Sequence, residues 1–251
     1  MRYSPIFFLI QKAKIRLGVL KFKVEDRDIL EKHFSYYRNL KSIYSKDFEK
    51  RLVFFLAIKQ FIPRGINQVT REMQLMIGAT AVMISFGFQN VTLKHFKKIL
   101  VYNDNYYSTI NKQYHQGEVN PRLGVIVISW TNFVRGFADG ADGINLGIHE
   151  MAHALKLENQ IQYNGESNFF NPKRWRDFSV LANNEIQKIL QENNSIFRDS
   201  AATNPHEFFA VALESFFEKP RELRDYNADL YQSLVFLLKQ DPIVVMNLPY
   251  G

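Results

Sequence analysis

The chain has 251 residues, of which 46% are hydrophobic and 14% aromatic, enough to build one sizeable hydrophobic core. It contains no cysteine, which excludes disulfide bonds, thiolate metal sites and a cysteine nucleophile, so any metal must be held by His, Asp or Glu. The net charge of +7 comes from lysines and arginines spread along the chain without a recognition motif, so we expect no nucleic-acid partner.

The N-terminal stretch MRYSPIFFLIQKAKIRLG carries an apolar run of only six residues before Gln11 and Lys12. This run is too short for a signal-peptide core or a membrane span. We therefore expect a cytoplasmic protein without stable membrane insertion, whose N-terminus packs against the rest of the domain.

Three segments before residue 90 have apolar residues at helical spacing. Helices are predicted over residues 24–40, 45–61 and 69–87, and the last is apolar enough to lie in the core. The stretch FIPRGINQ at 61–68 contains Pro and Gly and is interpreted as a break between the second and third of these helices.

Strands are predicted in the middle of the chain. The β-branched runs ILVYND at 99–104 and GVIVISW at 124–130 are typical of strands, so a small sheet is predicted between residues 98 and 130. The polar and aromatic segment 105–124 is expected to form a loop or hairpin arm. The glycine-rich stretch 135–145 is expected to form a turn.

The C-terminal part of the chain is predicted to be helical. Its expected helices cover residues 145–159, 174–193, 204–220 and 221–240. Together the elements predict an α+β fold, mostly helical with a small β-sheet. We expect residues 1–90 to form an N-terminal helical scaffold packed on the core, and residues 91–251 to form the catalytic region.

The segment NLGIHEMAHALKLEN contains His149, Glu150 and His153 in the order H-E-x-x-H. On a helix, residues i and i+4 share a face, so both imidazoles can bind one metal ion. Glu150 is turned about 100° around the axis, which suits a base acting on a metal-bound water. The alternative is an exposed helix with two histidines. The apolar neighbours instead indicate a buried helix, where unpaired polar side chains are costly.

A catalytic zinc site usually has three protein ligands and a water, so the motif needs a third ligand. The side chains that we consider for this role lie on the C-terminal side of the motif. They are Glu158, Glu166, His206, Glu207 and Glu214.

The segment NPHEFFAVALESFFEKP is the most informative source of this ligand. Glu207 and Glu214 are seven residues apart and share a helix face, so one can bind the metal while the other supports a ligating histidine. However, Asn204, Pro205 and Glu207 also have the spacing of a helix-capping box. Spacing alone therefore leaves Glu207 as either a cap or a ligand.

The sequence resembles the Mlc titration factor family of zinc peptidases, whose catalytic region is similar to the metalloprotease domain of anthrax lethal factor. The resemblance is carried by LVYND, GVIVISW, DGINLGIHEMAHAL and NPHEFFAVALESFFEKP in this order, and also by FIPRGINQVTREMQLMIGATAVM. It covers residues 25–242. It implies a zincin-like metalloprotease core.

The resemblance also implies the roles of individual residues. Zinc would be held by His149, His153 and Glu207, with Glu150 as general base and Glu214 supporting a ligand. Two positions depart from the family pattern: Lys156 stands where an Asp is usual, and Ser200 stands where a Tyr is common.

The expected function is hydrolysis of a peptide or protein substrate by a metal-activated water, with Glu150 as general base. The substrate is expected to lie along the edge of the GVIVISW strand. The alternative is a regulatory binding protein, because the family is named for capturing a transcriptional repressor. In that case the partner is a transcriptional regulator and hydrolysis is weak or incidental.

Overall fold

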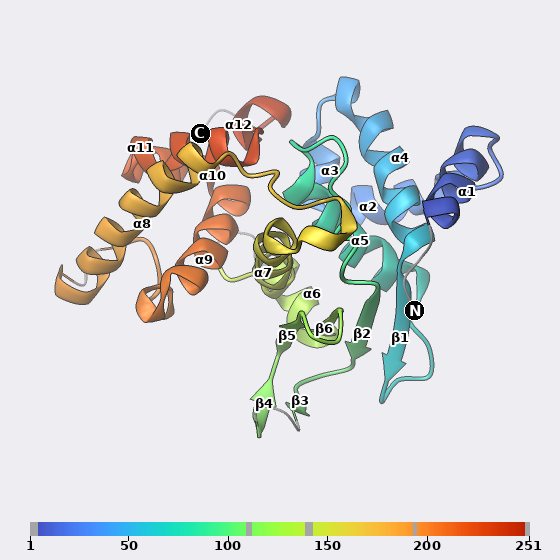
Figure 1. The fold of residues 1–251 in the computed structure, drawn as a ribbon, viewed down its shortest axis with the longest axis horizontal. Helices are drawn as coiled ribbons and strands as arrows, with labels where there is room; N and C mark the ends of the chain where they lie inside the picture. Colours follow the sequence, from blue (N-terminus) through green and yellow to red (C-terminus); the bar gives the residue numbers. More distant parts are fainter. Residues whose placement is uncertain (1–4, 109–111, 139–142, 193–194, 249–251) are drawn as a thin grey trace.

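A four-stranded mixed sheet lies at one side of the molecule. The computed structural model describes residues 5–108, 112–138, 143–192 and 195–248. The sheet order is β1 (Gln60–Arg64), β2 (Lys98–Tyr102), β6 (Val125–Ser129) and β5 (Gly117–Asn120). The first three strands are parallel, and β5 is antiparallel to β6 (Figure 1).

Two sequence predictions about this sheet are wrong. The stretch read as a break contains β1, so the sheet extends beyond residues 98–130. The presence of Pro63 is the reason for the incorrect prediction. Proline is tolerated here because β1 is an edge strand, so the missing N–H does not remove a hydrogen bond of the sheet. The GVIVISW strand is not an edge: β6 is buried throughout, between β2 and β5, and the exposed edge beside it belongs to β5.

The predicted arm between the strands includes a small hairpin. Strands β3 (Tyr106–Ser108) and β4 (Gln113–His115) pair antiparallel, and β5 follows them. The glycine-rich stretch was expected to be a turn, yet its first part belongs to helix α6 (Trp130–Ala138), which begins directly after β6. Residues 139–142 of that stretch lie outside the described residues.

The N-terminal part is helical, as predicted, with different bounds. Its helices are α1 (Pro5–Arg16), α2 (Val24–His33), α3 (Ser35–Asn39), α4 (Ser42–Ile58) and α5 (Arg71–Ser85). The helix expected over 24–40 is interrupted at Phe34, whose backbone is extended and whose side chain is fully buried. Helix α5 begins at the Thr70 cap and is buried from Leu75 to Ser85, as its apolar sequence indicates.

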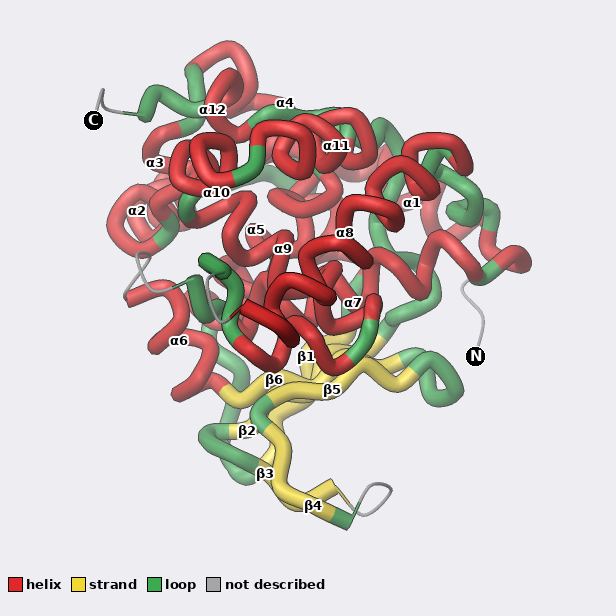
Figure 2. The backbone as a smooth tube through the Cα atoms, turned by 90° about the vertical axis from the view of Figure 1, so that its left-hand side faces the viewer, coloured by secondary structure: helices red, strands yellow, loops and turns green. Residues whose placement is uncertain are grey.

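The C-terminal part adds a second group of helices. They are α7 (Leu146–Gln160), α8 (Pro172–Glu192), α9 (Pro205–Glu218), α10 (Pro220–Tyr226), α11 (Ala228–Leu238) and α12 (Pro242–Val245). Helix α7 contacts α5, α9 and strands β5 and β6, so it runs through the centre of the molecule. Figure 2 shows the helices gathered on one side of the sheet, with the β3–β4 hairpin projecting away from them.

The fold class is therefore α+β, mostly helical with a small sheet, as predicted. The largest cluster of buried apolar side chains includes residues from α4, α5, α7 and α9. The division into a scaffold before residue 90 and a catalytic region after it stays a proposal. In the described parts of the chain, no helix is both long and apolar enough to cross a membrane.

Asp26 joins α2 to the start of α5. Its side chain is 2% exposed and accepts two hydrogen bonds from the Arg71 guanidinium, at 2.8 and 2.7 Å, and one from the Lys23 backbone N–H at 3.1 Å. Burial alone would raise the pKa of this carboxyl. The hydrogen bonds from Arg71 and Lys23 outweigh burial and hold the pKa below its usual 3.8.

We expect Asp26→Asn to lower the free energy of unfolding at pH 7 by about 1.5–3 kcal/mol, because a buried charge-assisted pair is lost. Because the pKa of Asp26 is lower in the folded state than in the unfolded state, the ionised carboxylate stabilises the protein at pH values above the unfolded-state pKa. This stabilisation is lost as the pH falls below 3.8, where wild type and variant should converge. Urea unfolding at pH 7 and at a pH below 3.8 measures this difference, with the exposed Glu25→Gln as control. Equal free energies for Asp26→Asn and wild type at pH 7 would contradict it.

Candidate metal centre

Helix α7 is fixed at its first turn by a buried cap. The Asn145 side chain accepts a hydrogen bond from the Ile148 N–H at 3.0 Å and is fully buried. The Asn145 backbone N–H donates to Glu214 Oε2 at 2.6 Å, which joins the start of α7 to α9. This anchoring fixes the helix that carries the H-E-x-x-H motif, both in its rotation about its axis and in its position along that axis.

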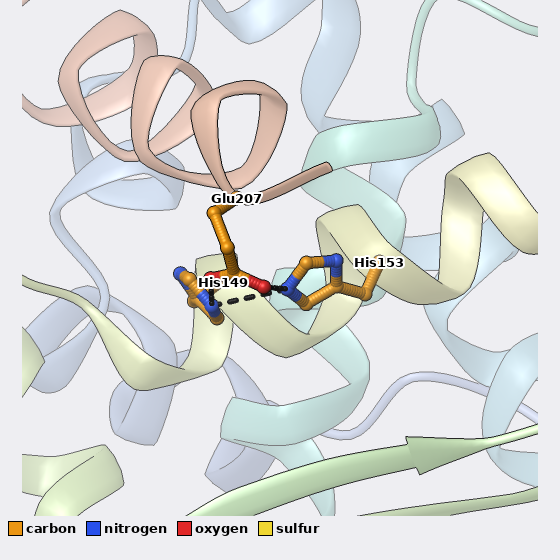
Figure 3. A group of neighbouring side chains, drawn as sticks. All are labelled: His149, His153 and Glu207. Carbon is orange, nitrogen blue, oxygen red and sulfur yellow. Dashed lines mark hydrogen bonds and ion pairs between the residues drawn. The ribbon is translucent and has the colours of Figure 1, made fainter. Parts of the chain in front are cut away.

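Three side chains converge between α7 and α9. His149 and His153 extend from one face of α7, and Glu207 reaches them from the first turn of α9 (Figure 3). The two Nε2 atoms are 3.1 Å apart. Glu207 Oε2 lies 3.2 Å from His149 Nε2, and Glu207 Oε1 lies 3.3 Å from His153 Nε2.

These separations suit a metal ion. Ligands bound tetrahedrally at about 2.0–2.2 Å lie about 3.3–3.6 Å from one another, close to the distances found here. The Nδ1–H of His149 donates to Glu214 Oε1 at 2.8 Å, which leaves its Nε2 lone pair directed at the shared point. Two imidazoles and a carboxylate are a donor set that Zn²⁺ and other divalent ions accept.

The structure separates the two roles that the sequence allowed for Glu207. The Asn204 side chain caps α9 by accepting from the N–H groups of His206 and Glu207 at 2.8 and 3.0 Å. The Glu207 carboxylate contacts the Nε2 atoms of the two histidines instead. Capping therefore uses the Glu207 backbone and leaves its carboxylate available to a metal.

Glu214 was expected to support a ligating histidine, and the structure places it against His149. Its partner on the other side, Arg198, was missed by sequence reasoning. The Arg198 guanidinium donates to Glu214 Oε2 at 2.9 Å and to Oε1 at 2.6 Å, and also to the Gly143 carbonyl at 3.0 Å. No periodic pattern marks Arg198, because it lies outside the regular helices of the site.

Glu150 lies beside the three donors and is 6% exposed. Burial raises its pKa to about 7, although His149 and His153 oppose the shift. A divalent ion would favour the carboxylate and lower this pKa. The backbone of β5 passes close to the carboxylate: a Cβ on Gly117 would lie 2.5 Å from Glu150 Oε1, so any other residue there would displace the Glu150 side chain.

The remaining candidate ligands lie elsewhere. Glu158 accepts the His95 N–H at 3.2 Å, and Glu166 accepts the Thr92 N–H at 2.9 Å, so both hold the segment before β2. His206 is exposed and not part of the donor group. Ser200, the second departure from the family pattern, accepts a hydrogen bond from Arg198 at 3.0 Å.

Comparison with known proteins gives the family. A model described as glucose-regulated metallo-peptidase M90 matches residues 9–238. The chain belongs to the M90 metallopeptidase family. An uncharacterized protein of Synechocystis sp. is 30% identical over 235 residues, covering 86% of this chain and 84% of its own. Mlc titration factor A of Yersinia pestis is 29% identical over 209 residues, covering 75% of this chain and 74% of the relative. The family resemblance drawn from the motifs is thereby confirmed.

In this M90 family member, we expect Arg198→Met to weaken zinc binding about 10–100-fold, because Glu214 loses the guanidinium that orients it toward His149 together with the Asn145 N–H. A competition titration with a chromogenic chelator measures this affinity. Arg198→Lys, which keeps the charge but cannot form the bidentate contact with Glu214, should give a smaller loss of zinc affinity. The exposed Arg176→Met is the control. Unchanged zinc affinity in Arg198→Met would show that Glu214 positions His149 without it.

Proposed function

We propose that this chain is a zinc-dependent peptidase, in which His149, His153 and Glu207 hold the metal and Glu150 is the general base. The observation that supports it most is the convergence of three donors within 4.8 Å of one another beside a buried carboxylate, in a metallopeptidase family. Zinc at these residues would polarise the scissile carbonyl and lower the pKa of water toward 7.

The side chains of the site would handle the proton. The Glu150 carboxylate takes the proton of the attacking water and delivers it to the nitrogen of the leaving amine. Its burial limits competition from bulk water. Glu214 and Arg198 hold the His149 ring in the orientation that keeps its Nε2 directed at the metal.

The peptide would lie along β5, which replaces the edge expected from the sequence. Among the described strands it pairs with β6 alone, so its other side can accept an extended backbone. Gly117 in β5 passes beside Glu150, so a peptide paired there reaches the base. Main-chain pairing gives affinity with little demand on the substrate sequence.

The test is cleavage of a mixed peptide library by the zinc-loaded protein, by the chelated protein and by the chelated protein after zinc is restored. Mass spectrometry identifies the cut sites, and the bound metal is quantified in each sample. We expect cuts only in the two zinc-containing samples. A protein that holds one equivalent of zinc and cuts no peptide in the library would contradict the proposal.

A second candidate is capture of a transcriptional regulator, which the name of the relative Mlc titration factor A supports. The two functions differ in their dependence on Glu150. Capture should survive Glu150→Gln, because a buried side chain contributes little to a docking surface, whereas hydrolysis should not.

A further inference from the structure

A pocket of about 230 Å³ opens directly beside the metal centre. Its walls come from the edge strand β5, from α7 and from the first turn of α9. The lining residues are Val119, His153, Lys156, Leu157, His206 and Glu207. Two of the proposed metal ligands, His153 and Glu207, therefore line the pocket, so a group bound in it lies next to the reacting bond.

Lys156 lines this pocket and carries a positive charge. The residue is 6% exposed, and its ammonium lies 5.1 Å from the centre of the Trp175 ring and 6.0 Å from that of Phe209. Such aromatic contacts stabilise a cation only in part. Among the described residues, no carboxylate lies within ion-pair distance of the ammonium and no group accepts a hydrogen bond from it.

The other buried lysine of the chain shows what Lys156 lacks. The Lys59 ammonium donates to the carbonyls of Leu93 and Phe96, which compensate for its loss of water. Burial lowers the pKa of Lys156 to about 8, with Glu207 opposing, so the ammonium stays mostly protonated at pH 7. A carboxylate that binds a divalent ion has little charge left for a neighbouring ammonium. The loaded pocket is therefore positive.

The edge strand fixes where the pocket lies along a substrate. Gly117 is beside Glu150, and Val119, two residues further on the same face of β5, lines the pocket. Two residues of a strand span about 6.6 Å. A side chain in the pocket thus belongs to a residue one or two positions from the scissile bond.

We propose that this pocket binds a carboxylate of the substrate next to the scissile bond, with Lys156 as the specificity-determining residue. The carboxylate belongs either to an Asp or Glu side chain or to the C-terminus of the peptide. This inference rests on the peptidase function proposed above, and it names the class of substrate.

The first test is binding, which does not depend on turnover. The ligands are short, acetylated and amidated peptides of Ala and Ser with a single Glu at each position in turn, each matched by a Gln peptide. A further pair differs only in a free or amidated C-terminus. Zinc-loaded Glu150→Gln protein is titrated with each peptide by calorimetry. We expect the carboxylate to tighten binding about tenfold at one position or at the terminus.

Substitutions of Lys156 connect this preference to the pocket. Lys156→Met in the same background keeps the apolar stem and should remove the preference, with unchanged zinc content and melting temperature. Lys156→Glu should reverse it in favour of Lys peptides. Lys173→Met, which removes an exposed charge on α8, should leave it unchanged. Equal binding of carboxylate and amide peptides throughout, no binding of any acidic peptide, or a preference that persists in Lys156→Met overturns the proposal.

The library cleavage assay tests the carboxylate pocket and the peptidase function separately. Cuts by wild type without enrichment of acidic residues or free C-termini near the cut site leave the peptidase function intact and overturn the pocket assignment. Selective binding of carboxylate peptides without any cut overturns the peptidase function and supports the assignment. Enrichment that Lys156→Met abolishes supports both.

Discussion

Glu150→Gln is expected to lower kcat for peptide hydrolysis by about 10²–10⁴-fold while one zinc ion stays bound, because the amide cannot accept the proton of water. The substitution keeps the shape of a side chain that is 6% exposed, so His149 and His153 should hold their positions. Because burial disfavours the charged form of Glu150, replacing it by an amide should leave the melting temperature unchanged or raise it.

Two measurements accompany this turnover assay. Bound zinc is quantified by elemental analysis, and the melting temperature is recorded with and without a chelator. In wild type, kcat/KM should fall as the pH drops through an apparent pKa at or below about 7, since the base must be deprotonated to act. Glu150→Asn, which keeps the amide but shortens it, is a second inactive form. Wild-type turnover by zinc-loaded Glu150→Gln would assign the base to another residue.

Glu207→Ala is expected to weaken zinc binding by more than about a hundredfold and to abolish hydrolysis with it. Loss of residues that only orient a ligand costs about 10–100-fold, and loss of a direct ligand should exceed this. The change also removes one acidic group from the first turn of α9, a small loss of helix stabilisation. Competition with a chelator gives the affinity.

Glu222→Ala is the matched control for this variant. Glu222 lies in the first turn of α10, so its removal costs a similar helix-end charge, but its side chain is 54% exposed and pairs with Lys219 instead of the histidines. We expect zinc affinity in Glu222→Ala to equal that of wild type. If Glu207→Ala also matched wild type in zinc affinity, the Glu207 carboxylate would not be a zinc ligand.

The sequence by itself determined the features that depend on residues close together in the chain. The spacing of His149 and His153 places both imidazoles on one helix face wherever the helix packs. The α+β class, the central helix α5 and the capping of α9 by Asn204 follow in the same way from apolar periodicity and capping patterns. The matched motifs also gave the family, because they occur in its order along nearly the whole chain.

Only the tertiary structure decided how distant segments meet. Strand β1 forms through pairing with β2, which no local pattern around Pro63 shows, and the order of the strands places β5, not β6, at the edge of the sheet. Arg198 reaches Glu214 and Glu214 reaches His149 across 16 and 65 residues of chain. Lys156 likewise lines a pocket because α7, α9 and β5 pack around it. Such contacts depend on how whole helices and strands pack against one another. The free energy of this packing comes from residues far apart in the sequence, so no short stretch determines it.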